Sequence, residues 1–348
     1  MNMRRQKEGK FSSAAAEVMS ETSMGEGEDK GNEGEENMET LTVTLKTVTP
    51  LFLAGADGRT PELRAPSIKG MMRFWWRAMK VLSIEELRKE EGDLFGSSDE
   101  GVGRSKFALS VRKNDEIEVI PYQPLPHHTG DKLCPYLKEN PSCNRDGRCS
   151  KGNKPNAIAP NQKFECIIRA NTVAIKKVED ILKVSLILGG LGKRSRRGFG
   201  SIKIIKENDS DFSFDYSLTS IRDLLNTIVP QGYKTNGSKI EKDKPALADS
   251  NYPYIKEIEI GNGCKKYEDL LKVIGRASHK NDCKYTGFAL GQDRLASPIY
   301  VSIIKDGNDY KPIITRLHPA FKNPLHGKEK DNSVQFICDI LNNAGGCK

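Results

Sequence analysis

The twelve residues 189–200, GGLGKRSRRGFG, are the part of this chain best suited to binding a charged ligand. They include five glycines and four basic side chains. Glycine permits close backbone approach and positive φ angles, and Lys and Arg neutralise phosphate groups, so we expect a polyanionic ligand. The expected contacts are Gly190, Gly192, Lys193, Arg194, Arg196, Arg197, Gly198 and Gly200. The alternative is a solvated turn that is merely basic, because charge runs are usually solvated surface.

The order of elements around this segment argues against a mononucleotide pocket. Residues 178–188 are apolar at helical spacing, and residues 200–206 alternate between apolar and polar side chains as in a strand. Walker and dinucleotide loops run in the opposite order, from strand through loop to helix, because the helix N-terminus must point at the phosphate.

A second group of basic residues belongs to a predicted helix over residues 67–82, with Ser67 as candidate N-cap. Its apolar stripe predicts a buried face. Trp76 lies near the basic stripe and is placed to stack a base, although packing against a neighbouring domain is commoner and is what we expect. Phe74 lies away from the main stripe, which indicates burial against a second domain or a partner. If the helix lies beside residues 189–200, further phosphate contacts come from Arg64, Lys69, Arg73 and Arg77. The alternative is a solvated helix face.

A polar insertion, residues 113–162, contains a candidate zinc knot made by His128, Cys134, Cys143 and Cys149. The gaps of eight and five residues between these positions are wider than in compact zinc knuckles. A flexible loop with free thiols is the alternative, and we expect no other cofactor.

Catalytic motifs are not apparent. The sequence has no Walker motif, nucleophile elbow or HExxH. A metal-independent nuclease needs a general acid or base near the basic loop, for which the candidates are His127, His128, His279, His318 and His326. Asp57 is expected to be a turn residue. The string RGFGSIKI partly matches the RNA-binding strand of an RRM domain, but Ser201 stands where a second aromatic is expected, which weakens base stacking on the sheet.

Charge is unevenly distributed along the 348 residues. Residues 1–40 carry five Lys or Arg and ten Asp or Glu, a net charge of −5, so the total of +8 leaves +13 on residues 41–348. A basic folded part indicates nucleic acid or another anionic partner. No stretch approaches the roughly 18 apolar residues of a membrane span, and the eight cysteines are too sparse for a secreted disulfide scaffold, so we expect a cytoplasmic protein without a membrane partner.

The predicted fold is α+β with two ferredoxin-like (RRM-like) domains in tandem. Residues 1–40 are expected to be a disordered acidic tail, with Met38 a candidate for the authentic start. Residues 41–214 follow the order strand, helix, strand, strand, helix, strand, with the insertion 113–162 between the second and third strands. Residues 215–348 are expected to form a second, degenerate copy, joined through a polar stretch at 231–250.

Three blocks together resemble a known family: PELRAPSIKGMMRFWWRA at 61–78, DLFGSS at 93–98 with the glycines that follow, and GLGKRSRRGFG. They are similar to the RAMP superfamily of CRISPR-associated RNA-binding proteins, and within it to the first-numbered Cmr subunit of type III-B effector complexes. The segment QDRLASPIYVSI at 292–303 resembles the second domain more loosely. This resemblance implies two ferredoxin-like domains that hold guide or target RNA beside other Cmr RAMP subunits, without catalysis. The acidic tail and the region 127–155 depart from the pattern.

Three hypotheses follow. The first is an RNA-binding structural subunit of a type III-B complex for antiviral defence, which holds single-stranded RNA by backbone charge. The second is a metal-independent CRISPR-type endoribonuclease. The third is an adaptor whose basic face meets an acidic protein.

Overall fold

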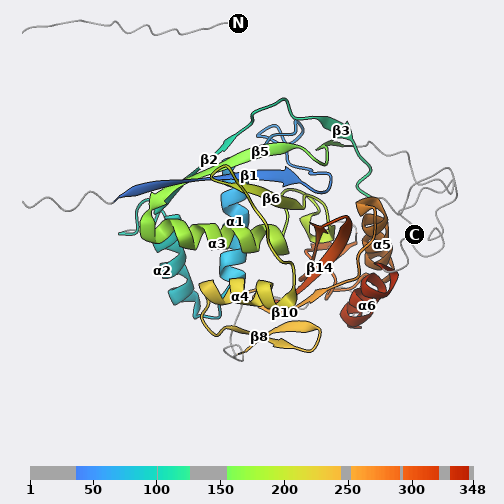
Figure 1. The fold of residues 1–348 in the computed structure, drawn as a ribbon. Coiled ribbons are helices and arrows are strands. Elements are labelled where there is room, and N and C mark those ends of the chain that lie inside the picture. The colour runs from blue at the N-terminus through green and yellow to red at the C-terminus, as the bar shows by residue number, and fades with distance from the viewer. Residues whose placement is uncertain are drawn as a thin grey trace, which may run out of the picture. The chain divides into compact units, whose positions relative to one another are not determined.

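The computed structural model describes residues 37–99, 101–125, 155–243, 252–290, 293–320 and 330–344, and these belong to one compact unit, 37–348. Residues 1–36 of the predicted tail and the candidate zinc ligands lie outside the described residues. The tail was predicted to extend to residue 40, but residues 38–40 already belong to the first strand, because they pair with residues 169–171. Two five-stranded antiparallel sheets and six helices organise the unit (Figure 1). The mixed α and β composition predicted from the sequence is therefore confirmed.

The first sheet has the strand order β2-β5-β1-β6-β7. Its strands are β1 (Met38–Thr47), β2 (Phe107–Arg112), β5 (Lys163–Asn171), β6 (Ile202–Glu207) and β7 (Ser210–Asp211). The alternation predicted for β1 is confirmed, because Leu41, Val43 and Leu45 are buried. The short hairpin of β3 (Val119–Pro121) and β4 (Asn156–Ile158) lies within the insertion.

Three helices connect and cover the strands of the first sheet: α1 (Ala65–Met79), α2 (Ile84–Phe95) and α3 (Thr172–Leu188). Helix α1 begins before the predicted cap. Arg64 is its N-cap residue, Pro66 lies in the first turn where a missing amide is tolerated, and Ser67 is already helical. Helix α2, which the sequence analysis did not predict, starts at a capping box of Ser83 and Glu86.

The second sheet has the order β13-β14-β10-β9-β8. Its strands are β8 (Tyr233–Asn236), β9 (Lys239–Lys242), β10 (Ile255–Ile260), β13 (Ile299–Asp306) and β14 (Asp309–Leu317). This half of the chain also contains the helices α5 (Tyr267–Lys280) and α6 (Ser333–Ala344) and the small hairpin of β11 (Phe288–Leu290) and β12 (Asp293–Leu295). The positions of β13, β14 and β10 correspond to those of β2, β5 and β1 in the first sheet. In the first sheet, β6 lies beside β1. In the second sheet, β9 has the corresponding position beside β10, although β9 precedes β10 in the chain.

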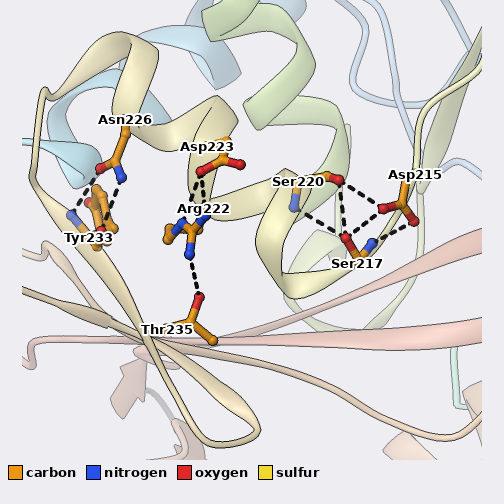
Figure 2. Close-up of polar contacts among 8 residues, drawn as sticks. All are labelled: Asp215, Ser217, Ser220, Arg222, Asp223, Asn226, Tyr233 and Thr235. Carbon is orange, nitrogen blue, oxygen red and sulfur yellow. Dashed lines mark hydrogen bonds and ion pairs between the residues drawn. The ribbon is translucent and has the colours of Figure 1, made fainter.

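The hairpin β8–β9 corrects the expectation of a polar connection at 231–250. Only Tyr233 and Ile240 of this hairpin are buried, so its sequence carries little alternation. Tertiary contacts hold it instead. Asn226 of α4 (Leu218–Ile228) accepts a hydrogen bond from the amide of Tyr233 and donates one to the carbonyl oxygen of Tyr233, both at 3.0 Å. Ser217, which is hydrogen-bonded to Asp215, caps the start of α4. Figure 2 shows both sets of contacts.

The two sheets share a core. Side chains of α1, α3 and α4 form one apolar cluster with both sheets, so these helices lie between the sheets. A second cluster packs α5 and α6 against the other face of the second sheet. Figure 1 shows α1 and α3 on one face of β1 and β5, with no helix of the described chain on the opposite face. We call that opposite face the open face of the first sheet.

Candidate nucleic-acid interface

A groove of about 730 Å³ opens at the end of the first sheet where β1 finishes. Three segments that are distant in sequence form it: the stretch after β1, the ends of the insertion, and the glycine-rich loop at 189–200. The lining residues are Phe52, Leu53, Ala54, Gly58, Arg59, Pro124, Pro155, Asn156, Lys193 and Arg194.

The glycine-rich loop is joined to the stretch after β1 by backbone pairing. The amide of Lys193 donates to the carbonyl oxygen of Phe52 at 2.8 Å. At Gly192, φ is +79°, and an added Cβ would lie 2.3 Å from that same oxygen, so only glycine fits. Gly200 (φ +66°) cannot be replaced by a larger residue for the same reason, because an added Cβ would lie 2.0 Å from the carbonyl oxygen of Leu191.

The glycines therefore explain the shape of the loop by contacts within the chain. Gly190 follows the same pattern, with its Cβ position 2.9 Å from the carbonyl oxygen of Phe199. The sequence analysis placed these glycines in contact with a polyanion. The structure shows that they bring the loop backbone against neighbouring backbone, and the basic side chains are left to meet a ligand.

The groove presents three cations. Lys193 and Arg194 are exposed and come from the glycine-rich loop, where Arg194 has a left-handed φ of 63°. The third, Arg59, is also exposed and was not among the predicted contacts. No Asp or Glu is found among the described residues that line the groove. Its field is therefore positive, which suits phosphate groups.

Arg59 is held by a turn that the sequence did signal. Asp57 Oδ1 accepts from the amides of Arg59 at 2.9 Å and Thr60 at 3.0 Å. A hydrogen bond from the Thr60 hydroxyl, followed by these amide bonds, lowers the pKa of Asp57. The expectation that Asp57 is a turn residue is confirmed. The signal that would have identified Arg59 is its position two residues after Asp57, in a predicted turn that places a basic side chain at the surface.

The other two basic residues of the glycine-rich loop point to the second half of the chain. They belong to a 3-10 turn, Ser195–Arg197. The Arg196 guanidinium lies 4.8 Å from the ring centre of Tyr300 on β13. Arg197 donates to the carbonyl oxygens of Thr286 at 2.6 Å and Ile299 at 3.2 Å. Gly198 (φ +80°) lies against the side chains of Ile303, Ile274 and Leu271. These three positions have partners within the chain, and their contact with RNA stays a prediction.

The basic stripe of α1 also has partners within the chain. Glu91 of α2 accepts both hydrogen bonds of the Arg77 guanidinium, at 2.8 and 3.0 Å, and pairs with Arg73 at 3.6 Å. Lys69 lies 4.8 Å from the ring centre of Phe107. Arg64, the N-cap residue, is half-buried. The stripe thus faces α2 and β2, and none of these four side chains lines the groove. The groove therefore does not include the stripe, and the contact of these four residues with RNA stays a prediction.

The aromatic residues serve the core. Trp76 is fully buried and packs against Phe95 of α2, with ring centres 6.1 Å apart, so its ring is not available to stack on a base. Phe74 does meet the second half, 5.3 Å from Tyr300, as predicted. Ser201, where an RRM domain has an aromatic, is 1% exposed.

The proposed zinc ligands His128, Cys134, Cys143 and Cys149 are outside the described residues. Within the described ranges, no group of three or more His, Cys, Asp or Glu side chains is arranged to hold a metal ion. Helices in those ranges are too short or too polar to cross a membrane.

Comparison with known proteins agrees with this architecture. The family model of the RAMP superfamily matches residues 44–203, which include α1, α2, α3, β2, β5 and the glycine-rich loop. That match spans less than half of the chain and indicates the class of the protein. Among curated relatives, the CRISPR system Cmr subunit Cmr1-1 of Pyrococcus furiosus is 30% identical over 296 residues, which are 77% of this chain and 84% of that subunit. Subunit Cmr1-2 of the same organism is 30% identical over 179 residues, 46% of this chain and 92% of that subunit.

The chain belongs to the RAMP superfamily and, within it, to the family of these Cmr1 subunits of type III-B CRISPR complexes. Solved structures have the same fold. The apo crystal structure of Cmr1 from Pyrococcus furiosus aligns with a TM-score of 0.53 at 18% identity, over 88% of this chain and 97% of that one. A chain of the type III-B Cmr-beta complex bound to cognate target RNA aligns with a TM-score of 0.52 at 15% identity, over 88% and 99%.

Proposed function

We propose that this chain is a non-catalytic, RNA-binding subunit of a type III-B Cmr complex, built from two ferredoxin-like units. It holds guide or target single-stranded RNA beside other Cmr subunits. The basic groove of Arg59, Lys193 and Arg194 is the observation that carries the proposal. Three exposed cations, with no carboxylate among the described residues that line the groove, suit a phosphate backbone, because such contacts position a nucleic acid without reading its sequence. One solved structure with this fold is a chain of a Cmr-beta complex bound to cognate target RNA, which supports RNA as the ligand.

The nuclease alternative has less support. A metal-independent ribonuclease needs a general acid or base within hydrogen-bond reach of the RNA. Of the candidate histidines, only His279 and His318 are described, and neither lines the groove. His318 is stacked on Tyr254, with ring centres 4.8 Å apart. Burial, and then the charge of Lys256, lower the pKa of His318.

The test compares the full-length chain with the triple variant Arg59→Ala, Lys193→Ala, Arg194→Ala. Binding of labelled single-stranded RNA is measured over a range of salt concentrations. Each lost phosphate contact on a single strand reduces the salt slope by about 0.7, so the triple variant should lose about 2 from the slope of log K against log salt. The control variant Lys89→Ala, Lys256→Ala, Lys266→Ala removes the same charge from exposed positions elsewhere.

The outcomes separate the hypotheses. Salt-dependent binding that the groove variant loses and the control retains supports the proposal. RNA cleaved by the purified chain, with loss of cleavage in a histidine variant, would establish the nuclease instead. RNA binding that is equal in both variants would favour the adaptor hypothesis, in which the basic surface meets an acidic protein.

A further inference from the structure

Four lysines lie side by side on neighbouring strands next to the groove. In the strand registers, Lys46 of β1 is directly opposite Lys163 of β5 on one side and Lys203 of β6 on the other. Strand β13 runs beside β6, where the amide of Ile303 donates to Ser201 Oγ at 3.0 Å. Lys203 of β6 follows Ser201 by two residues, and Lys305 of β13 follows Ile303 by two residues. The charge of Lys305 contributes to lowering the pKa of both Lys46 and Lys203, so Lys305 lies near both. We call Lys163, Lys46, Lys203 and Lys305 the lysine row.

The row lies at the open face of the first sheet. Side chains alternate along β1, so Leu45 is buried against the helices while Lys46, its neighbour, projects to the opposite face. Lys163 is exposed and the other three lysines are partly exposed. Thr42 and Thr44 of β1 have the same parity as Lys46 and add hydroxyl donors to that face.

The row is energetically unfavourable as it stands. Like charges directly opposite each other on adjacent strands destabilise a sheet. Among the ion pairs of the described residues, none includes any of the four lysines. Burial, followed by the charges of their lysine neighbours, lowers the pKa of both Lys46 and Lys203. A bound anion would relieve this repulsion.

The row continues the groove. The segments that line the groove are the direct continuations of the same strands: Phe52 and Arg59 follow β1, Asn156 precedes β5, and Lys193 precedes β6. Lys163, Lys46 and Lys203 lie on three adjacent strands of the first sheet, so two strand spacings of about 4.8 Å separate Lys163 from Lys203 by about 10 Å. Lys305 extends the row from β13 of the second sheet. A row of cations suits a chain that carries a charge on every unit.

We propose that the lysine row binds the phosphodiester backbone of single-stranded RNA that leaves the groove and crosses the open face of the first sheet. This inference rests on the proposed function, since the groove supplies the RNA. It adds a path for the strand and a second set of contacts. The contacts are made to phosphates, because the open face presents lysines and threonines where an RRM domain presents aromatic rings. Glu165, opposite Thr44 on the same face, is already paired with Arg112.

The test uses the full-length chain and the row variant Lys46→Gln, Lys163→Gln, Lys203→Gln, with uridine oligomers of about 6 and about 30 nucleotides as probes. For the long oligomer, three lost contacts reduce the salt slope by about 2 and weaken binding by up to about 100-fold at 0.1 M salt. The short oligomer fills the groove alone, so the row variant should bind it like the unchanged chain. The groove variant Arg59→Ala, Lys193→Ala, Arg194→Ala should lose affinity for both oligomers.

Matched controls keep the two proposals apart. The variant Lys89→Gln, Lys256→Gln, Lys266→Gln removes the same charge elsewhere and should bind both oligomers normally. Thermal melting verifies folding, and the row variant should melt no lower than the unchanged chain because repulsion has been removed. If the row variant binds the long oligomer like this control, the row inference is overturned while the groove result still decides the proposed function.

A further outcome concerns the class of partner. If the row variant keeps its RNA affinity and loses affinity for poly-glutamate, the row belongs to an acidic protein segment and the inference is also overturned.

Discussion

Arg197 Nη2 donates a hydrogen bond of 2.6 Å to the carbonyl oxygen of Thr286, which lies 89 residues further along the chain. The guanidinium also stands 5.1 Å from the ring centre of Phe336 on α6. Burial, then the charges of Arg196 and Arg194, lower the pKa of Arg197 to about 10, so it remains charged at neutral pH. One arginine of the glycine-rich loop therefore links the first half of the chain to the second.

This link predicts that Arg197→Met destabilises the protein more than it weakens RNA binding. Loss of the charged donor removes the hydrogen bond to the carbonyl oxygen of Thr286, while the carbonyl oxygen of Ile299 still accepts from the Ser297 hydroxyl. Loss of a hydrogen bond from a charged donor costs about 1.5–3 kcal/mol. Urea denaturation measures the change, and RNA binding is measured on the folded variant. Arg194→Met is the control, since a substitution at an exposed position usually changes stability by less than about 0.5 kcal/mol. Normal stability combined with lost RNA binding would show that Arg197 contacts phosphate after all.

Two glycines with similar backbone angles allow a matched test of the loop geometry. Gly192→Ala places a Cβ 2.3 Å from the Phe52 carbonyl oxygen, whereas Gly58→Ala, at φ +68°, meets no atom within 4 Å. Both variants incur the left-handed strain of about 1–2 kcal/mol, and only Gly192→Ala adds a clash that displaces the loop. We expect Gly192→Ala to lose more stability and to weaken RNA binding in the groove. Equal effects on stability and binding at the two positions would contradict the close backbone approach.

The pairing of α1 with α2 predicts that the basic stripe contributes little to RNA affinity. For the double variant Arg73→Gln, Arg77→Gln, the salt slope of RNA binding should change by less than about 0.5, whereas two lost phosphate contacts would remove about 1.4. The stability loss should be modest, up to about 1 kcal/mol, because the ion pairs with Glu91 are partly exposed. A slope change near the larger value would restore the stripe to the RNA-binding surface.

Lys242 should make stability depend on pH. Its Nζ donates to the carbonyl oxygen of Met79 at 2.6 Å, at the end of α1. Burial, and then the charge of Lys80, lower its pKa from 10.5 to about 8. Between pH 8 and 10.5 the folded chain releases this proton while the unfolded chain retains it, so stability rises with pH across this window.

The measurement is the difference in unfolding free energy between the unchanged chain and Lys242→Met at pH 7.5 and pH 10. It should shift in favour of the unchanged chain by on the order of 1 kcal/mol, less than the full linkage value because the amine is partly exposed. Lys256→Met, at an exposed lysine, should give a difference that does not vary with pH. A constant difference for Lys242→Met as well would refute the assignment.

Local pattern was sufficient for most elements of the fold. Alternation in β1 and helical spacing in α1 identified the buried residues correctly, because a strand or helix beside a core displays its period in its own sequence. The exceptions are α2, the hairpin β8–β9 and the short strands β3, β4, β7, β11 and β12. The hairpin is held by Asn226, Tyr233 and the neighbouring strand β10, and such contacts leave little trace in the local sequence.

By itself, the sequence determined that a basic, glycine-rich loop joins a helix to a strand, and it identified the family. Tertiary structure alone decided which cations line the groove. Arg73, Arg77 and Arg197 found partners 14 to 102 residues away, whereas Lys193 and Arg194 met Arg59 across a groove. The physical reason is that a guanidinium binds a carboxylate, a carbonyl or a phosphate with the same donors, so only the folded chain shows which of these it has reached.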